Sequence, residues 1–284
     1  MKIKNVDTLF HGTRNLSSLL SIIKNGFYAS YADEVFAKRN IKILMVSFSN
    51  IPLIEARNQV NYGDYFIGLK RSWGLQKRLH PVAYSYEESV YENNINYIEQ
   101  EAVFGAIAMQ KKHMKKDSIE LESDSDYFQY ISRLAAQNLS LETTLTLEEL
   151  FTNLYLKSNE IQLYYKHYST FDKKGNARFA YNDREWRFIP EIIEVRKLIF
   201  ESTYSKDYFN PEYSKYSELK KPHFKENPLL FDLNDINYIV VKKKDDIKKV
   251  FKALNSKFSE RAVYENLIQG ELTILPMDKI WNDL

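Results

Sequence analysis

The 284-residue sequence contains no cysteine, which excludes disulfide bonds and thiolate metal sites. It also has no run that approaches the ~20 apolar residues that a membrane helix needs. Its first residues, Met1 to Asn5, lack the apolar core of a signal peptide. We therefore expect a cytoplasmic protein that does not associate with a membrane.

Glycine and proline are scarce, at 8 and 7 residues, and no linker rich in Gly, Ser or Pro is visible. Large side chains are plentiful, because 44% of the residues are hydrophobic and 14% are aromatic. The 40 basic and 38 acidic residues leave a net charge of only +2, which argues neither for nor against a nucleic-acid partner. These features predict a single globular domain over residues 1–284.

The periodicity of the apolar residues changes twice along the chain. Strand-like runs occur at 43–48, 65–69, 81–84, 186–189, 236–241 and 272–275. Helical spacing dominates residues 89–158, and the charged stretch 204–227 is typical of a long surface loop. The pattern predicts an α+β fold whose mixed β-sheet core carries a helical insertion at 89–158. The apolar faces of that insertion favour partner binding or homo-oligomerisation there.

The triplet His11-Gly12-Thr13 follows a short apolar run and precedes a helix predicted over 16–25, which Gly26 ends. This order places an imidazole and a backbone without a side chain beside a helix N-terminus, an arrangement that suits an anionic, ribose-bearing ligand. The alternative is that His11 is a buried structural histidine and Gly12 an ordinary turn residue.

A second segment alternates charged and aromatic residues from Glu185 to Phe188. On a strand, Glu185 and Arg187 would share one face, while Trp186 and Phe188 would pack on the core from the other. The polar face is either a strand-edge ion pair, which contributes little to stability, or a carboxylate that stabilises positive charge or activates a nucleophile.

Two tyrosines, Tyr62 and Tyr65, lie among glycines in a third segment. Their rings suit stacking on a planar ligand, although core packing is the more frequent use. The five histidines show no metal-ligand spacing, so we expect no metal.

Several of these segments together resemble the AbiGi family, bacterial abortive-infection proteins from phage-resistance loci. The matching segments are 46–53, 62–69, 73–75, 81–84, 183–190, 239–241 and 272–275. The resemblance implies a role in phage defence. Because the family carries an antitoxin label, it also implies a cognate toxin or antitoxin, or a phage protein, as partner.

A more distant similarity links the chain to ADP-ribosyltransferases with a His-Tyr-Glu site. It implies an ADP-ribosyltransferase-like sheet and NAD as the substrate. His11-Gly12-Thr13 would be the first NAD-binding motif, with His11 on a ribose hydroxyl and the Gly12 backbone on the nicotinamide amide. Arg14 or Arg187 would meet the pyrophosphate.

The same similarity implies a catalytic set of His11, Tyr65 and Glu185. Tyr62 or Tyr65 would stack on the nicotinamide ring. Glu185 would hold the ribose 2′-hydroxyl and stabilise the oxocarbenium-like transition state. Asp183 stands where these enzymes usually carry a second glutamate, which leaves open a nucleic-acid or other acceptor, or no turnover.

Three functional hypotheses follow. The chain is an ADP-ribosyltransferase-type defence enzyme, a catalytically inactive antitoxin or sensor on the same fold, or a defence nuclease. We expect His11, Glu185 and an aromatic residue from 62–65 to line one pocket. A pocket that contains them but is filled by side chains such as Phe10 or Trp186 favours the second hypothesis, and clustered acidic residues that bind a divalent ion favour the third.

Overall fold

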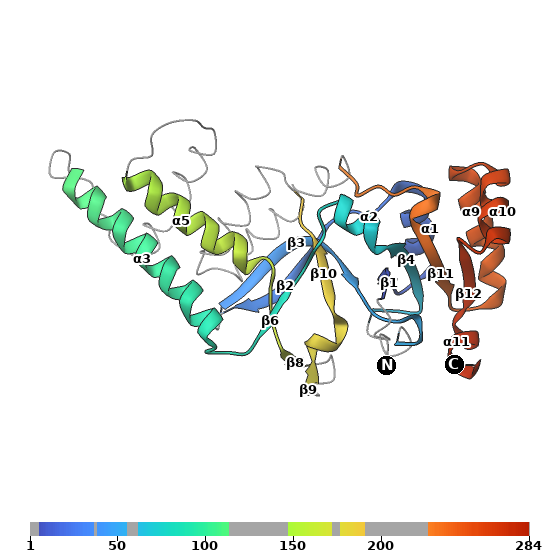
Figure 1. Ribbon diagram of the computed structural model, residues 1–284, viewed down its shortest axis with the longest axis horizontal. Helices are drawn as coiled ribbons and strands as arrows, with labels where there is room; N and C mark the ends of the chain where they lie inside the picture. The colour runs from blue at the N-terminus through green and yellow to red at the C-terminus, as the bar shows by residue number, and fades with distance from the viewer. Residues whose placement is uncertain are drawn as a thin grey trace.

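The computed structural model describes residues 6–36, 39–55, 62–113, 147–171, 177–190 and 227–283. Its centre is an eight-stranded mixed sheet. Seven of the strands follow the order β12-β11-β4-β1-β3-β10-β5, and the eighth, β2, also pairs with β3. Helices lie at both ends of the molecule (Figure 1). This confirms the predicted combination of a mixed sheet with several helices, whereas an ADP-ribosyltransferase-like core stays a prediction.

Every pairing in the main sheet is antiparallel except that of β11 with β12. The strands are β1 (Thr8–Thr13), β2 (Ser30–Phe36), β3 (Arg39–Ser49), β4 (Tyr65–Lys70), β5 (His80–Pro81), β10 (Glu185–Phe188), β11 (Ile236–Val241) and β12 (Thr273–Pro276). The sequence pattern missed β2, because Asp33 and Glu34 interrupt its apolar alternation. The strand forms as the partner of β3 and ends at the buried Phe36.

The single strand predicted over 81–84 is two strands. The N–H of Val82 donates to the carbonyl of Glu185, and that of Ala83 donates to the carbonyl of Tyr164. After β5 the chain therefore stops pairing with β10. It continues as β6 (Ala83–Ser85), which pairs in parallel with β7 (Tyr165–His167). A small antiparallel pair, β8 (Ser169–Phe171) and β9 (Ala177–Phe179), then leads through the 3₁₀ turn η3 (Ala180–Asp183) into β10.

The predicted strand–helix unit at the N-terminus is confirmed. Asn15 caps the N-terminus of helix α1 (Leu16–Asn25). Its side chain accepts a hydrogen bond from the N–H of Ser18 at 2.9 Å. Gly26 ends it with a positive φ of 83° and donates to the carbonyl of Ile22.

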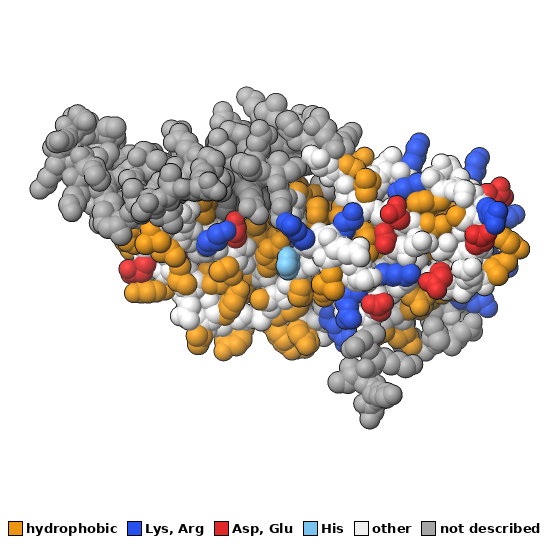
Figure 2. Space-filling view, turned by 45° about the horizontal axis from the view of Figure 1, so that its top comes forward, with side chains coloured by type: hydrophobic (Ala, Val, Ile, Leu, Met, Phe, Trp, Pro, Cys, Tyr) orange, Lys and Arg blue, Asp and Glu red, His pale blue; other side chains and the backbone are white. Residues whose placement is uncertain are grey.

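The remaining helices are placed at the two ends of the sheet. Helices α2 (Arg71–Gln76), α9 (Ile247–Lys257), α10 (Glu260–Gln269) and α11 (Met277–Asp283) lie with α1 around β1, β4, β11 and β12 (Figure 1). The largest buried cluster is here and includes Leu19 from α1, Trp73 from α2 and Val250 from α9. Figure 2 shows charged side chains concentrated over this end and hydrophobic ones toward the other.

Within the predicted insertion, α3 (Val90–His113) and α5 (Leu147–Gln162) pack against each other and project from the opposite end of the sheet (Figure 1). The helices approach closely at Gly105, where an added Cβ would lie 2.3 Å from the Phe151 ring. A helix expected over 127–138 and the loop expected over 204–227 lie outside the described residues. None of the described helices is both long and apolar enough to span a membrane.

Candidate functional site

The two motifs from the sequence meet at one small cavity. Strand β3 lies between β1 and β10, so that Phe10 and Glu185 are both register partners of Ser49. The cavity has a volume of about 30 Å³. It is lined by Phe10, His11, Gly12, Ser47, Phe48, Ser49, Ile51, Tyr62, Phe66 and Glu185.

His11 is held on one side by the backbone and on the other by aromatic rings. Its Nδ1 lies 2.8 Å from the carbonyl oxygen of Ser47, which can only accept, so Nδ1 carries the proton. The ring packs against Phe27 and Phe48, with centroids 5.1 and 5.6 Å away. Burial lowers the pKa of His11, although the bond to Ser47 opposes this effect. His11 is therefore a neutral imidazole that lines the cavity.

Glu185 is the centre of a buried ion cluster. Its Oε1 accepts from Arg187 Nε at 2.7 Å and its Oε2 from Lys166 Nζ at 2.5 Å. Glu34 completes the cluster, accepting from Arg187 at 2.8 Å and from Lys166 at 3.2 Å. Burial would raise the pKa of Glu185, but Arg187 and Lys166 outweigh it and hold the pKa below its ordinary value. Glu185 is thus a carboxylate with a cation on each oxygen.

Arg187 is fully buried, and protein atoms engage each of its three nitrogens. Besides Glu185 and Glu34, it donates through Nη1 to the carbonyl oxygens of Leu163 at 2.6 Å and Tyr165 at 3.2 Å. The ion pair proposed for this strand face is present, but it lies inside the sheet between β3 and β5 and not at an exposed edge.

The two candidate tyrosines lie in different environments. Tyr62 lines the cavity and donates to Asp183 Oδ2 at 2.8 Å, and Arg178 donates to the same oxygen. Burial and the Asp183 charge raise the pKa of Tyr62. Tyr65 instead belongs to the main core and donates to Asp246 at 2.9 Å; burial and this bond raise its pKa to about 12. The structure brings Tyr62, and not Tyr65, to the cavity.

A protein-family model matches residues 25–242, with the description "Putative abortive phage resistance protein AbiGi, antitoxin". The chain belongs to this family. No curated protein and no solved structure matches the chain. The AbiGi match includes Tyr62 and the four residues of the ion cluster, whereas His11 and Gly12 lie before it. The resemblance to ADP-ribosyltransferases is not shown.

Two other predicted ligand residues of this AbiGi chain, Thr13 and Arg14, do not line the cavity. Thr13 is buried and donates to the carbonyl of Asn15 at 3.1 Å, and Arg14 is exposed. Gly12 does line the cavity, but an added Cβ would lie 2.8 Å from both Phe66 and Tyr62. Packing alone therefore favours a glycine at position 12.

Three residues of the site carry no signal in the local sequence. Lys166 and Glu34 reach Glu185 and Arg187 from strands β7 and β2. Tyr84 accepts from the backbone N–H of Glu185 at 2.7 Å. Over the described ranges, no group of three or more His, Asp and Glu residues could hold a metal ion.

Proposed function

We propose that this protein is the antitoxin of an abortive-infection system and acts by binding a protein partner, its cognate toxin, without catalysis. The description of its family supplies the antitoxin role and the phage-resistance setting. The geometry of the His11–Glu185 cavity supports a role that needs no turnover.

The observation that carries this proposal is the state of Glu185. A catalytic carboxylate must touch the substrate, but cations hold both oxygens of Glu185, whose side chain is only 4% exposed. The cavity beside it, at about 30 Å³, holds about two water molecules. Pockets for small-molecule ligands are roughly 300–1,000 Å³.

A second candidate is ADP-ribosyl transfer from NAD, with a nucleic-acid or other acceptor. One observation favours it, namely that the His11-Gly12 pair, Tyr62 and Glu185 line one cavity although these three positions are far apart in the sequence. This activity would require the cavity to open and Lys166 to release Glu185. No comparable observation favours the nuclease hypothesis.

The test combines two assays on the full chain. The first measures whether expression of this protein restores the growth of cells that express the toxin of the same locus. The second measures transfer of labelled ADP-ribose from NAD to lysate protein, DNA and RNA, for wild type and Glu185→Gln. We expect rescue of growth and no label transfer.

Label transfer by wild type that disappears in a folded Glu185→Gln variant would overturn the proposal in favour of the enzyme. Failure to rescue growth, with the protein expressed and folded, would overturn the antitoxin role itself. Circular dichroism of both proteins establishes that they are folded.

A further inference from the structure

A second cavity, distinct from the first, opens where three segments converge: the turn from α2 to β5, the C-terminal end of α5, and the end of β10. Its volume is about 360 Å³, within the range of small-molecule pockets. It is lined by Gln76, Lys77, Arg78, His80, Glu160, Leu163, Tyr164, Phe188 and Ile189. It shares no lining residue with the His11–Glu185 cavity.

The turn after α2 forms one wall and has an unusual residue at its key position. The N–H of Arg78 donates to the carbonyl of Leu75 at 3.1 Å, and that of Leu79 donates to Gly74 at 2.8 Å. These two bonds form a Schellman motif, in which the residue at the place of Arg78 is usually glycine. Arg78 adopts the left-handed conformation there, with φ of 57°. Such backbone strain in a non-glycine residue is concentrated at functional sites.

The same turn concentrates nitrogen donors on one wall. Gln76, Lys77, Arg78 and His80 all line the pocket within five consecutive residues, and all are exposed. The acidic group on the other side, Glu160, accepts from Lys157 at 2.8 Å and is therefore already partly neutralised. Two of the lining side chains, Lys77 and Arg78, carry a formal positive charge and one, Glu160, a negative charge, a balance that favours an anion.

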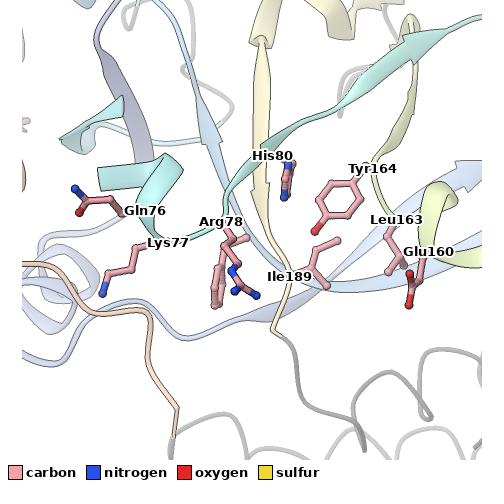
Figure 3. A pocket seen from close by; sticks show the side chains of 9 residues that line it. Gln76, Lys77, Arg78, His80, Glu160, Leu163, Tyr164 and Ile189 are labelled. Carbon is pink, nitrogen blue, oxygen red and sulfur yellow. The ribbon is translucent and has the colours of Figure 1, made fainter. Parts of the chain in front are cut away.

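The opposite wall is aromatic and apolar. The ring of Tyr164 lies edge-on to His80, with centroids 5.3 Å apart and an interplanar angle of 77°. Leu163 and Ile189 are buried beneath the opening. Figure 3 shows Lys77 and Arg78 on one side, Tyr164, Leu163 and Glu160 on the other, and Ile189 between them. This division suits a ligand with a charged end and a flat, weakly polar end.

We propose that this pocket binds a nucleoside phosphate. The phosphate lies against Lys77 and Arg78, because a guanidinium beside an ammonium forms charge-assisted hydrogen bonds with phosphate oxygens. The base lies along Tyr164 over Ile189, and Glu160 accepts hydrogen bonds from sugar hydroxyls or an exocyclic amine. The inference does not depend on the proposed antitoxin role.

The ligand chemistry has two sources, a free nucleotide and the phosphorylated end of a nucleic acid. Calorimetric titration of the full chain with AMP, GMP, CMP, UMP and 5′-phosphorylated trinucleotides distinguishes them. Inorganic phosphate, titrated alone, isolates the contribution of the anion wall. We expect saturable binding of at least one mononucleotide, and the trinucleotides show whether a longer chain binds better.

Three variants test the assigned contacts. Lys77→Ala and Arg78→Asn each weaken nucleotide binding by about tenfold or more, since each removes a charge-assisted bond. Asn tolerates the left-handed conformation, so the turn is retained. Tyr164→Leu weakens nucleotide binding and leaves phosphate binding unchanged. The matched control, Lys248→Ala on the exposed side of α9, has no effect.

Two results overturn the proposal. One is the absence of binding by the folded wild type to every nucleotide and trinucleotide at millimolar concentration. The other is binding that Lys77→Ala and Arg78→Asn leave unchanged while their thermal melting curves match wild type. If either variant fails to fold, Arg78→Gly removes the same charge and supplies the residue that the Schellman position favours.

Discussion

The two cavities of this protein differ in how their charged groups are used. In the His11–Glu185 cavity the carboxylate is buried and neutralised by Arg187 and Lys166, and the space beside it is about 30 Å³. In the pocket beside α2, Lys77 and Arg78 are exposed at the wall of a space of about 360 Å³. The residues that look most catalytic in the sequence are thus engaged within the fold. The type of a residue does not decide whether it can meet a ligand; its burial does.

The sharpest test of this contrast replaces the buried Arg187 and compares the effect with that of replacing exposed arginines. Arg187→Ala leaves the buried Glu185 and the partly buried Glu34 with Lys166 alone, and we expect a loss of about 3–5 kcal/mol in the free energy of unfolding. Arg261→Ala, which breaks an exposed pair with Glu265, changes it by about 0.5 kcal/mol or less. Urea unfolding measures both, together with Arg78→Asn. A loss below about 1 kcal/mol for Arg187→Ala would show that the cluster is not the structural element described here.

The dependence of the free energy of unfolding on pH gives a second test of the buried ion cluster. The pKa of Glu185 is lower in the folded chain than its ordinary value near 4.5, so its ionisation stabilises the fold above that pH. This stabilisation is lost as the pH falls below about 4.5, toward the folded pKa. We expect Glu185→Gln to lose about 3 kcal/mol at pH 7 and less than that at pH 3. A difference between the two proteins that stays constant from pH 7 to pH 3 would contradict the assignment.

The smallest effect concerns the packing around the first cavity. Gly12→Ala would bring a Cβ within 2.8 Å of Phe66 and Tyr62, and we expect a loss of roughly 1–3 kcal/mol from overpacking. Gly74→Ala, whose Cβ would lie 2.4 Å from Leu9, makes a comparable intrusion on residues that do not line this cavity, and it serves as the matched control. Thermal melting measures both. An unchanged Gly12→Ala protein would show that space is available at this position, as a ligand-binding role requires.

The sequence predicted those parts of the fold that local signals determine. The β1–α1–Gly26 unit has a strand, a cap and a stop within a short stretch, and β4 and β11 are clear apolar runs. Helix α10 was missed, since its Glu, Arg, Asn and Gln residues obscure the apolar face that packs on α9.

Part of the candidate site was also predictable, because the His11 and Glu185 motifs are visible in the local sequence. The placement of His11 and Glu185 at one cavity agrees with the hypothesis, but it depends on a third strand, β3, that contacts both of their strands. The pairing of Glu185 with Arg187 was one of the two interpretations of this strand, but Lys166 and Glu34 were not foreseen, because Lys166 lies 19 residues from Glu185 and Glu34 lies 153 residues from Arg187. Long-range register, and not local pattern, decides which charges are neutralised.

Strand β3 has a mechanical consequence. Its first seven residues, Arg39–Met45, pair with β2, and its last four, Val46–Ser49, pair with β10. Ile43 and Leu44 belong to one buried cluster, whereas Val46 and Phe48 belong to another. One continuous backbone therefore crosses both clusters, so neither can melt without disrupting the strand that the other needs. The two clusters should therefore unfold together, and a force applied to the end that carries α3 and α5 would be transmitted through β3 to the rest of the sheet.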